Sequence, residues 1–346
     1  MIKQICLILL LYSIDSLKSQ PSWDGLDFQN IEEQLKTNKI VKFIDMHKYL
    51  KANGKIDHFA NEVYLVELEN GLLAVFKPEK DSNAIENCLG EIVAYEIDKV
   101  LGFKLVPPTV LIAYGERFGS LQFFVESPFD LLKGKEYKEA FSMLDNEEIN
   151  RMYMFYYILG QWDTHHGNKI ISFNQESQKA KLALIDNAGM INFVQARYGE
   201  HAFVRRLYDD SYVAEKINFP FDKAQIIKLP IKYDEFVKRL DGFNVSKRTL
   251  KHWNNSYKSL CYVVWNNGLW IQYYKNNESV PINYTDHCSK ATYDAFKKLD
   301  RALLEQAWSK AYEYKSKEEI NGLIDMILQR RDEVNLTINR SIYKFT

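Results

Sequence analysis

Short apolar runs typical of β-strands come in two pairs in the first half of the chain. In the first pair, residues 63–68 and 72–77 are rich in Val, Leu and Phe and flank Asn70-Gly71. Asn-Gly between two such runs favours a tight turn, so we expect a β-hairpin there. Residues 110–114 and 120–125 repeat the pattern and predict a second hairpin. Together the pairs indicate a small antiparallel sheet.

Between the two hairpins the apolar positions recur with the spacing of a helix. The side chain of Asn83, with Glu86 three residues later, can cap the start of that helix. Gly102 can end it after Leu101, because glycine adopts left-handed backbone angles without a steric penalty. Cys88 lies within this expected helix, and we expect it to be a buried small hydrophobic residue.

The chain becomes mainly helical after Pro128. We expect helices at residues 146–160, 289–308 and 316–334, the last opened by the capping box Ser316-x-x-Glu319. Two short strands are expected at residues 169–173 and 181–185. The pattern therefore predicts an α+β fold with two lobes, a small β-rich lobe with one helix and a larger, mainly helical lobe.

The N-terminus has the features of a secretory signal peptide. Residues 5–12 form an almost continuous apolar run, and small and polar residues follow up to Ser19. We expect cleavage near Ser19 and no stable membrane insertion afterwards, because no later run approaches the length of a membrane span. The expected segments are a signal peptide, an N-terminal extension, the small lobe and the large lobe, at residues 1–19, 20–58, 59–126 and 127–346.

The net charge, the N-terminal signal and the glycosylation sequons indicate where the protein acts and which partners it lacks. The net charge of −1 gives no electrostatic reason to expect nucleic acid or an anionic membrane as a partner. With the signal peptide, we expect a secreted or secretory-pathway protein, in the Golgi or outside the cell in a eukaryote and periplasmic or secreted in a bacterium. Six Asn-x-Ser/Thr sequons predict a glycosylated face in a eukaryote, and unused sequons are the alternative. They begin at Asn244, Asn254, Asn277, Asn283, Asn335 and Asn339.

Lys77 ends the second expected strand, after Ala74-Val75-Phe76. An ammonium in that place can reach the α- and β-phosphates of a nucleotide. Glu91, on the expected helix, lies among apolar neighbours where an unpaired charge would be costly, so we expect it to pair with Lys77. Glu86 is the alternative partner, although capping explains it better.

A second group of polar residues lies between the expected helix at 146–160 and the end of the following strands. Asp163 is a candidate base for a hydroxyl proton, and His165 can orient it by a hydrogen bond. Asn168 and Asp186 offer the hard oxygen ligands that Mg²⁺ prefers. The arrangement is typical of a phosphoryl-transfer site. The adjacent histidines His165 and His166 match no zinc-binding spacing, and we expect His166 to pack.

The order of these motifs resembles the atypical kinase superfamily, which includes phosphatidylinositol 3/4-kinase-like proteins, HipA-like kinases and four-jointed-type secretory-pathway kinases. The motifs that carry the resemblance are Ala74-Val-Phe-Lys-Pro78, Gly90-Glu91-x-x-Ala94-Tyr95, Leu101-Gly-Phe103, Leu105-Val-Pro-Pro-Thr109, Asp163-x-His165-x-x-Asn168, Ile185-Asp186-Asn187 and Arg330-Arg331-Asp332. The resemblance implies a bilobal protein-kinase-like fold that binds ATP with Mg²⁺ or Mn²⁺.

The resemblance also implies roles for individual residues. Lys77 binds phosphate with Glu91 as its partner, Asp163 is the base, and Asn168 and Asp186 hold the metal. Phe124 and Glu126, where the second hairpin ends, are further candidates for contact with the nucleotide. Three positions depart from the pattern: Thr164 replaces an Arg, Ala188 replaces a Gly, and the phosphate-loop candidate at residues 54–61 has one glycine.

Three functions are compatible with these residues. The first is a kinase of the secretory pathway that transfers the γ-phosphate of ATP to a hydroxyl of a protein or glycan acceptor. The second is a nucleotide-binding pseudokinase that acts as an interaction protein, which the reduced phosphate loop favours. The third is a phosphatidylinositol-type lipid kinase, although secretion would separate it from cytosolic lipids.

Overall fold

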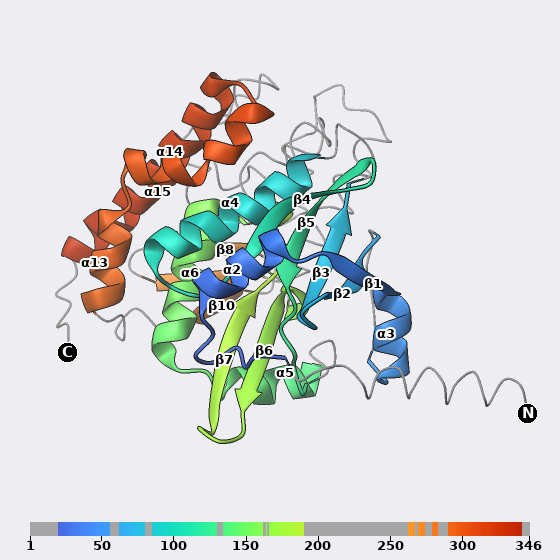
Figure 1. The fold of residues 1–346 in the computed structure, drawn as a ribbon. Helices are drawn as coiled ribbons and strands as arrows, with labels where there is room; N and C mark the ends of the chain where they lie inside the picture. The colour runs from blue at the N-terminus through green and yellow to red at the C-terminus, as the bar shows by residue number, and fades with distance from the viewer. Residues whose placement is uncertain are drawn as a thin grey trace, which may run out of the picture.

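A computed structural model describes the chain over residues 20–55, 62–79, 85–129, 134–161, 164, 166–189, 262–266, 269–273, 279–282 and 290–340. The fold is α+β with two lobes, as predicted (Figure 1). In Figure 1 the five-stranded sheet lies on the right, the C-terminal helices lie on the left, and α4 and α6 lie between them.

The small lobe is built on an antiparallel sheet with strand order β1-β2-β3-β5-β4. Its strands are β1 (Ile40–Asp45), β2 (Tyr64–Leu68), β3 (Leu73–Pro78), β4 (Thr109–Tyr114) and β5 (Arg117–Phe123). Gly71 has a φ of +86° in the β2–β3 turn, and Gly115 has a φ of +61° between β4 and β5. Both predicted hairpins are therefore confirmed, although β5 begins three residues earlier than expected.

Helix α4 (Ile85–Leu101) connects the two hairpins and packs on β4 and β5. It ends where the sequence predicts, because Gly102 has a φ of +66°. Cys88 is buried on this helix as expected, with 1% of its surface exposed. The expected cap, Asn83, lies outside the described residues.

The segment at 20–58, expected to be an extension, supplies part of the sheet. It contains α2 (Phe28–Thr37), α3 (Met46–Ala52) and, between them, the edge strand β1, which pairs with β2. The pairing slips between Ile40 and Lys42, and Val41 at this bulge is 61% exposed. The bulge breaks the alternation of apolar and polar positions by which a strand is read from sequence.

The large lobe begins with α5 (Gly134–Phe141) and α6 (Asn146–Leu159), followed by the short helix η2 (His166–Asn168). The strands β6 (Lys169–Asn174) and β7 (Lys179–Leu184) form the predicted hairpin, and η3 (Asn187–Gly189) follows it. A three-stranded sheet has the order β10-β9-β8, from β8 (Tyr262–Asn266), β9 (Leu269–Tyr273) and β10 (Ser279–Ile282).

The prediction of one helix at 289–308 was wrong, because the segment forms two. Helix α13 (Lys290–Lys298) ends before α14 (Arg301–Ala307), and Asp300 caps α14 by accepting a hydrogen bond from the Leu303 amide. A turn of 3-10 helix, η7 (Ser309–Glu313), leads to α15 (Lys317–Arg340). The capping box of α15 is confirmed, since Ser316 and Glu319 exchange hydrogen bonds.

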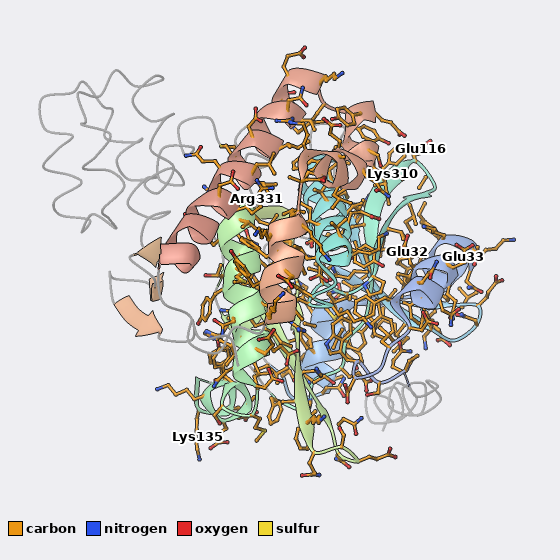
Figure 2. The ribbon with its side chains drawn as sticks, turned by 90° about the vertical axis from the view of Figure 1, so that its left-hand side faces the viewer. Glu32, Glu33, Glu116, Lys135, Lys310 and Arg331 are labelled. Atoms are coloured by element: carbon orange, nitrogen blue, oxygen red, sulfur yellow. The ribbon has the colours of Figure 1, made fainter. Side chains whose placement is uncertain are left out.

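The N-terminal segment contacts elements of both lobes. Trp23 donates a 3.0 Å hydrogen bond from Nε1 to the carbonyl of Leu182 on β7, and its side chain belongs to the core under the five-stranded sheet. Glu32 on α2, labelled in Figure 2, accepts hydrogen bonds from Tyr95 and Lys99 on α4. The segment therefore fixes α4 and the β6–β7 hairpin relative to the sheet.

Over the described ranges, none of the helices combines the length and the apolar character needed to cross a bilayer.

Candidate functional site

Lys77 lies at the centre of a three-residue ionic cluster. It is held on β3, where its backbone pairs with Ser120 of β5. Its Nζ is 2.6 Å from Oε1 of Glu91 on α4 and 3.0 Å from Oδ1 of Asp186, which follows β7. The expected ion pair between Lys77 and Glu91 is thus present, and the second carboxylate comes from a residue 109 positions away from Lys77.

The Glu91 carboxylate is held from two sides. Only 2% of the residue is exposed, and its second oxygen, Oε2, accepts a 3.0 Å hydrogen bond from the Asn187 amide. A buried carboxylate is tolerated when both oxygens have donors, and here an ammonium and a backbone amide supply them. Glu91 therefore ties α4 to the segment that follows β7, in addition to positioning Lys77.

The charges of the cluster shift the protonation of its members. Burial by itself lowers the pKa of Lys77, but the carboxylates of Asp186 and Glu91 outweigh it, so the pKa lies above the ordinary value of a lysine. Burial raises the pKa of Glu91, and the Lys77 ammonium opposes that rise. Lys77 consequently carries a proton throughout the physiological pH range.

Asp186 adopts a left-handed backbone conformation, which is uncommon among residues other than glycine. Its φ is +57°, in the left-handed region that favours glycine, and Gln161 donates a 2.9 Å hydrogen bond from Nε2 to its carbonyl oxygen. Its side chain is 49% exposed although one oxygen binds Lys77. Strained residues of this kind cluster at functional sites, where surrounding contacts maintain the strain.

Asn168 lies at the same end of the β6–β7 hairpin as Asp186. Lys169 pairs with Leu184, and the carbonyl of Asn168 accepts a 3.0 Å hydrogen bond from the Ile185 amide. Asn168 itself is 5% exposed. The hairpin therefore brings together the two residues that the sequence proposes as metal ligands.

The donor set of this site suits a hard divalent cation. Among Lys77, Glu91 and Asp186, two carboxylates face one ammonium, which leaves one negative charge in excess within the cluster. One Asp and one Asn are enough protein ligands for Mg²⁺, which keeps several waters. In the parts of the chain that the structure describes, no group of three or more His, Cys, Asp or Glu residues forms an alternative metal site.

The proposed base Asp163 and its neighbour His165 lie outside the described residues. Thr164 between them is fully buried, and its carbonyl accepts a short hydrogen bond from the Lys169 ammonium. Lys169 is only 1% exposed, with Nζ 5.7 Å from the centre of the Tyr156 ring. The sequence identified Lys169 only as the start of a strand, although a charged residue directly beside the motif was a usable signal.

Phe124, Glu126 and His166 are the remaining residues that the sequence singles out. The Phe124 ring contacts the ring of Tyr49 on α3, and the Glu126 carboxylate lies close enough to Tyr49 to raise the pKa of its hydroxyl. His166 packs as expected, with its ring 5.3 Å from that of Tyr137. The roles of Phe124 and Glu126 toward a nucleotide stay predictions.

Gly90 allows the segment after Asp186 to approach α4 closely. A Cβ at this position would lie 3.0 Å from the Cα of Ala188, which is closer than ordinary packing permits. Ala188 stands where the resemblance expects a glycine. The residue without a side chain in this contact is therefore Gly90 on the helix. Its lack of a Cβ lets the segment approach closely enough for the Asn187 amide to reach Glu91.

No protein-family model matches the chain, and no curated protein matches it. Solved structures similar to it include a Helicobacter pylori proinflammatory kinase, CtkA, which is 15% identical with a TM-score of 0.46 and covers 84% of this chain and 95% of that one. A Golgi casein kinase with Mn/ADP bound is 12% identical with a TM-score of 0.42, covering 91% and 77%. The Rio2 kinase of Chaetomium thermophilum, in an ADP/Mg²⁺-phosphoaspartate complex, is 12% identical with a TM-score of 0.29, covering 72% and 82%. These structures are atypical kinases.

Proposed function

We propose that this protein is an ATP-dependent kinase of the atypical type, which phosphorylates a hydroxyl of a protein or glycan acceptor in the secretory pathway. The observation that carries the proposal is the cluster in which Glu91 of α4 and Asp186 after β7 both bind the ammonium of Lys77 on β3. A strand lysine paired with a glutamate of the adjacent helix is the arrangement that places an ammonium on nucleotide phosphates in kinases.

Each residue has a definite task in the proposed reaction. Lys77 binds the phosphates, and Glu91 holds its ammonium in position. Asn168 and Asp186 would hold Mg²⁺ or Mn²⁺, and the bound ATP would supply the phosphoryl group and leave as ADP. Asp163 accepts the proton of the acceptor hydroxyl, and His165 orients Asp163.

The nearest competing proposal is a pseudokinase that binds a nucleotide and acts as an interaction protein. The helix α3, at Met46–Ala52, favours it, because this helix and the residues after it connect β1 to β2, where a kinase carries its glycine-rich loop. The third proposal, a lipid kinase, has the phosphatidylinositol-kinase-like motifs in its favour.

One assay separates these proposals. The purified protein is incubated with γ-labelled ATP and Mn²⁺ or Mg²⁺, together with an acidic protein, a glycan panel or phosphatidylinositol vesicles. The proposed function requires label on the acidic acceptor protein or on a glycan of the panel. Label confined to the extracted lipid would establish the lipid kinase. A rise in melting temperature with ATP but no label on any acceptor, or on the protein itself, would leave the pseudokinase.

A further inference from the structure

An apolar cluster lies on the face of the sheet that carries Lys77. Side chains alternate along a strand, so Leu73, Val75 and Lys77 of β3 point to the same face. Leu65 of β2 pairs with Val75 and lies on that face too. Leu65 and Leu73 are almost completely buried, at 0% and 1% exposure, in a cluster with Met46.

This cluster occupies the region where the proposed site would bind the base of a nucleotide. Lys77 marks the phosphate end, and the apolar surface of Val75 and Leu73 continues from it along the same strand. Nucleotide bases are flat and largely apolar on their faces, and sites for such ligands are lined mainly by hydrophobic side chains. The base end of the site is therefore this apolar surface.

Helix α3 lies beside β1 and β2 and packs its apolar side chains against this cluster. Met46, at the start of the helix, is 4% exposed within the cluster, and Tyr49 and Leu50, one turn further, pack against it. The helix thus adds three side chains to the cluster at the base end of the proposed site.

The same helix and Lys55, three positions beyond it, contact the linker between the lobes, whose described part is residues 124–129 after β5. The ring of Tyr49 meets that of Phe124 edge-on, with centroids 5.8 Å apart. Burial and the nearby Glu126 carboxylate both raise the pKa of the Tyr49 hydroxyl. Lys55 donates a 2.6 Å hydrogen bond from Nζ to the carbonyl of Ser127. These contacts close the linker side of the base region.

We infer that α3 is a gate over the base end of the nucleotide site, held shut by Tyr49 on Phe124 and by Lys55 on Ser127. A nucleotide binds fully only when the helix leaves the linker. This inference rests on the proposed function and adds a regulatory step to it. A site that is open in only a fraction of the molecules binds its ligand more weakly by that same fraction.

The gate predicts that weakening its contacts tightens nucleotide binding. In Tyr49→Ala and in Lys55→Ala, the affinity for Mg-ATP, measured by calorimetry, should rise about 3- to 10-fold, because each contact contributes to the closed state. The matched controls are Tyr114→Ala, an exposed tyrosine on β4, and Lys51→Ala, an exposed lysine on α3. Both controls should bind Mg-ATP as the parent protein does.

Hydrogen exchange of the unmutated protein provides a second measurement that needs no variant. Adding Mg-ATP should speed exchange of the amides at 46–52, since the bound state requires the helix to leave the linker. Tighter binding in the two gate variants together with this faster exchange supports the inference.

Changes of affinity and of hydrogen exchange in the opposite direction would overturn the gate. Weaker binding in Tyr49→Ala, with slower exchange in α3 on adding Mg-ATP, would show that Tyr49 is a wall of the base site. The kinase proposal would then survive without the gate. Binding unchanged in both variants would likewise remove the gate alone. If neither the parent nor any variant binds ATP, the proposed function fails and the gate fails with it.

Discussion

A single ammonium between two carboxylates is the feature on which the proposed activity depends. Lys77 and Glu91 were recognisable from sequence, because a charged residue at a strand end and another on an apolar helix are both unusual. The contact of Asp186 with Lys77 could not be recognised from the sequence, because it joins residues 109 positions apart. The left-handed backbone of Asp186 was equally hidden, because no glycine marks it.

Lys169 is a positioning residue for the segment that contains Asp163, since its ammonium binds the Thr164 carbonyl. In Lys169→Met we expect the rate of phosphoryl transfer to fall about 10- to 100-fold while the KM for ATP changes little, because Lys77 and Asp186 are left in place. Steady-state kinetics with varied ATP provide the measurement. Lys169→Arg should recover part of the rate.

If Lys169→Met raised the KM for ATP about 10- to 100-fold and left kcat unchanged, Lys169 would instead act in nucleotide binding. A fall in both the rate and the melting temperature, without recovery in Lys169→Arg, would make its role structural.

At the scale of elements, local signals predicted what local forces determine. The turn at Asn70-Gly71, the end of α4 at Gly102 and the capping box at Ser316 and Glu319 are all where the sequence puts them. The break between α13 and α14 was missed because Asp300, an N-cap without a neighbouring Pro or Gly, is a weak signal inside an amphipathic pattern. Asp163 and His165 are untested, because they lie outside the described residues.

Asp98 connects α4 to the segment that follows it. Its Oδ2 accepts hydrogen bonds from the amides of Leu105 and Val106, at 2.9 and 3.1 Å, and the residue is 1% exposed. Burial raises its pKa to about 7. Between about pH 4 and pH 7 the folded state therefore holds a proton that the unfolded state has lost. The resulting contribution to stability is present in full below about pH 4 and disappears as the pH rises through about 7.

The substitution Asp98→Asn tests this pH dependence. The amide oxygen can still accept both backbone hydrogen bonds, but it does not titrate. Between pH 5 and pH 8 we expect the parent protein to lose on the order of 2 kcal/mol more unfolding free energy than the variant. Urea denaturation at the two pH values measures the difference. Parallel losses in the two proteins would show that Asp98 titrates as an ordinary surface carboxylate.

At the scale of the whole molecule, the N-terminal segment is part of the fold rather than an extension of it. Trp23 is 5% exposed, and its hydrogen bond to Leu182 spans 159 positions of sequence. Contacts of such separation leave no local pattern, so the sequence could indicate the two lobes but not this connection between them. Strand β1 was not predicted either, because the register shift in its pairing with β2 breaks the alternation of apolar and polar residues.

Removing the Trp23 side chain should destabilise the molecule as a unit. We expect Trp23→Ala to lower the free energy of unfolding by about 3–5 kcal/mol, the usual cost of deleting a buried large aromatic residue. Urea denaturation followed by circular dichroism gives the value, with the exposed Val41→Ala as a control that should change it by less than about 0.5 kcal/mol. A loss as small as that of the control would mean that the segment is peripheral.

The proposed kinase site around Lys77, Glu91 and Asp186 stands or falls with the substitution Asp186→Ala. The measurement is the initial rate of label transfer from γ-labelled ATP to casein with Mn²⁺, for the parent, for Asp186→Ala and for Asp294→Ala, a control at a solvent-accessible Asp on α13. We predict transfer by the parent and the control, and a loss of at least about 100-fold in Asp186→Ala. Equal transfer by all three proteins would show that Asp186 takes no part in the reaction and would refute the site proposed around it.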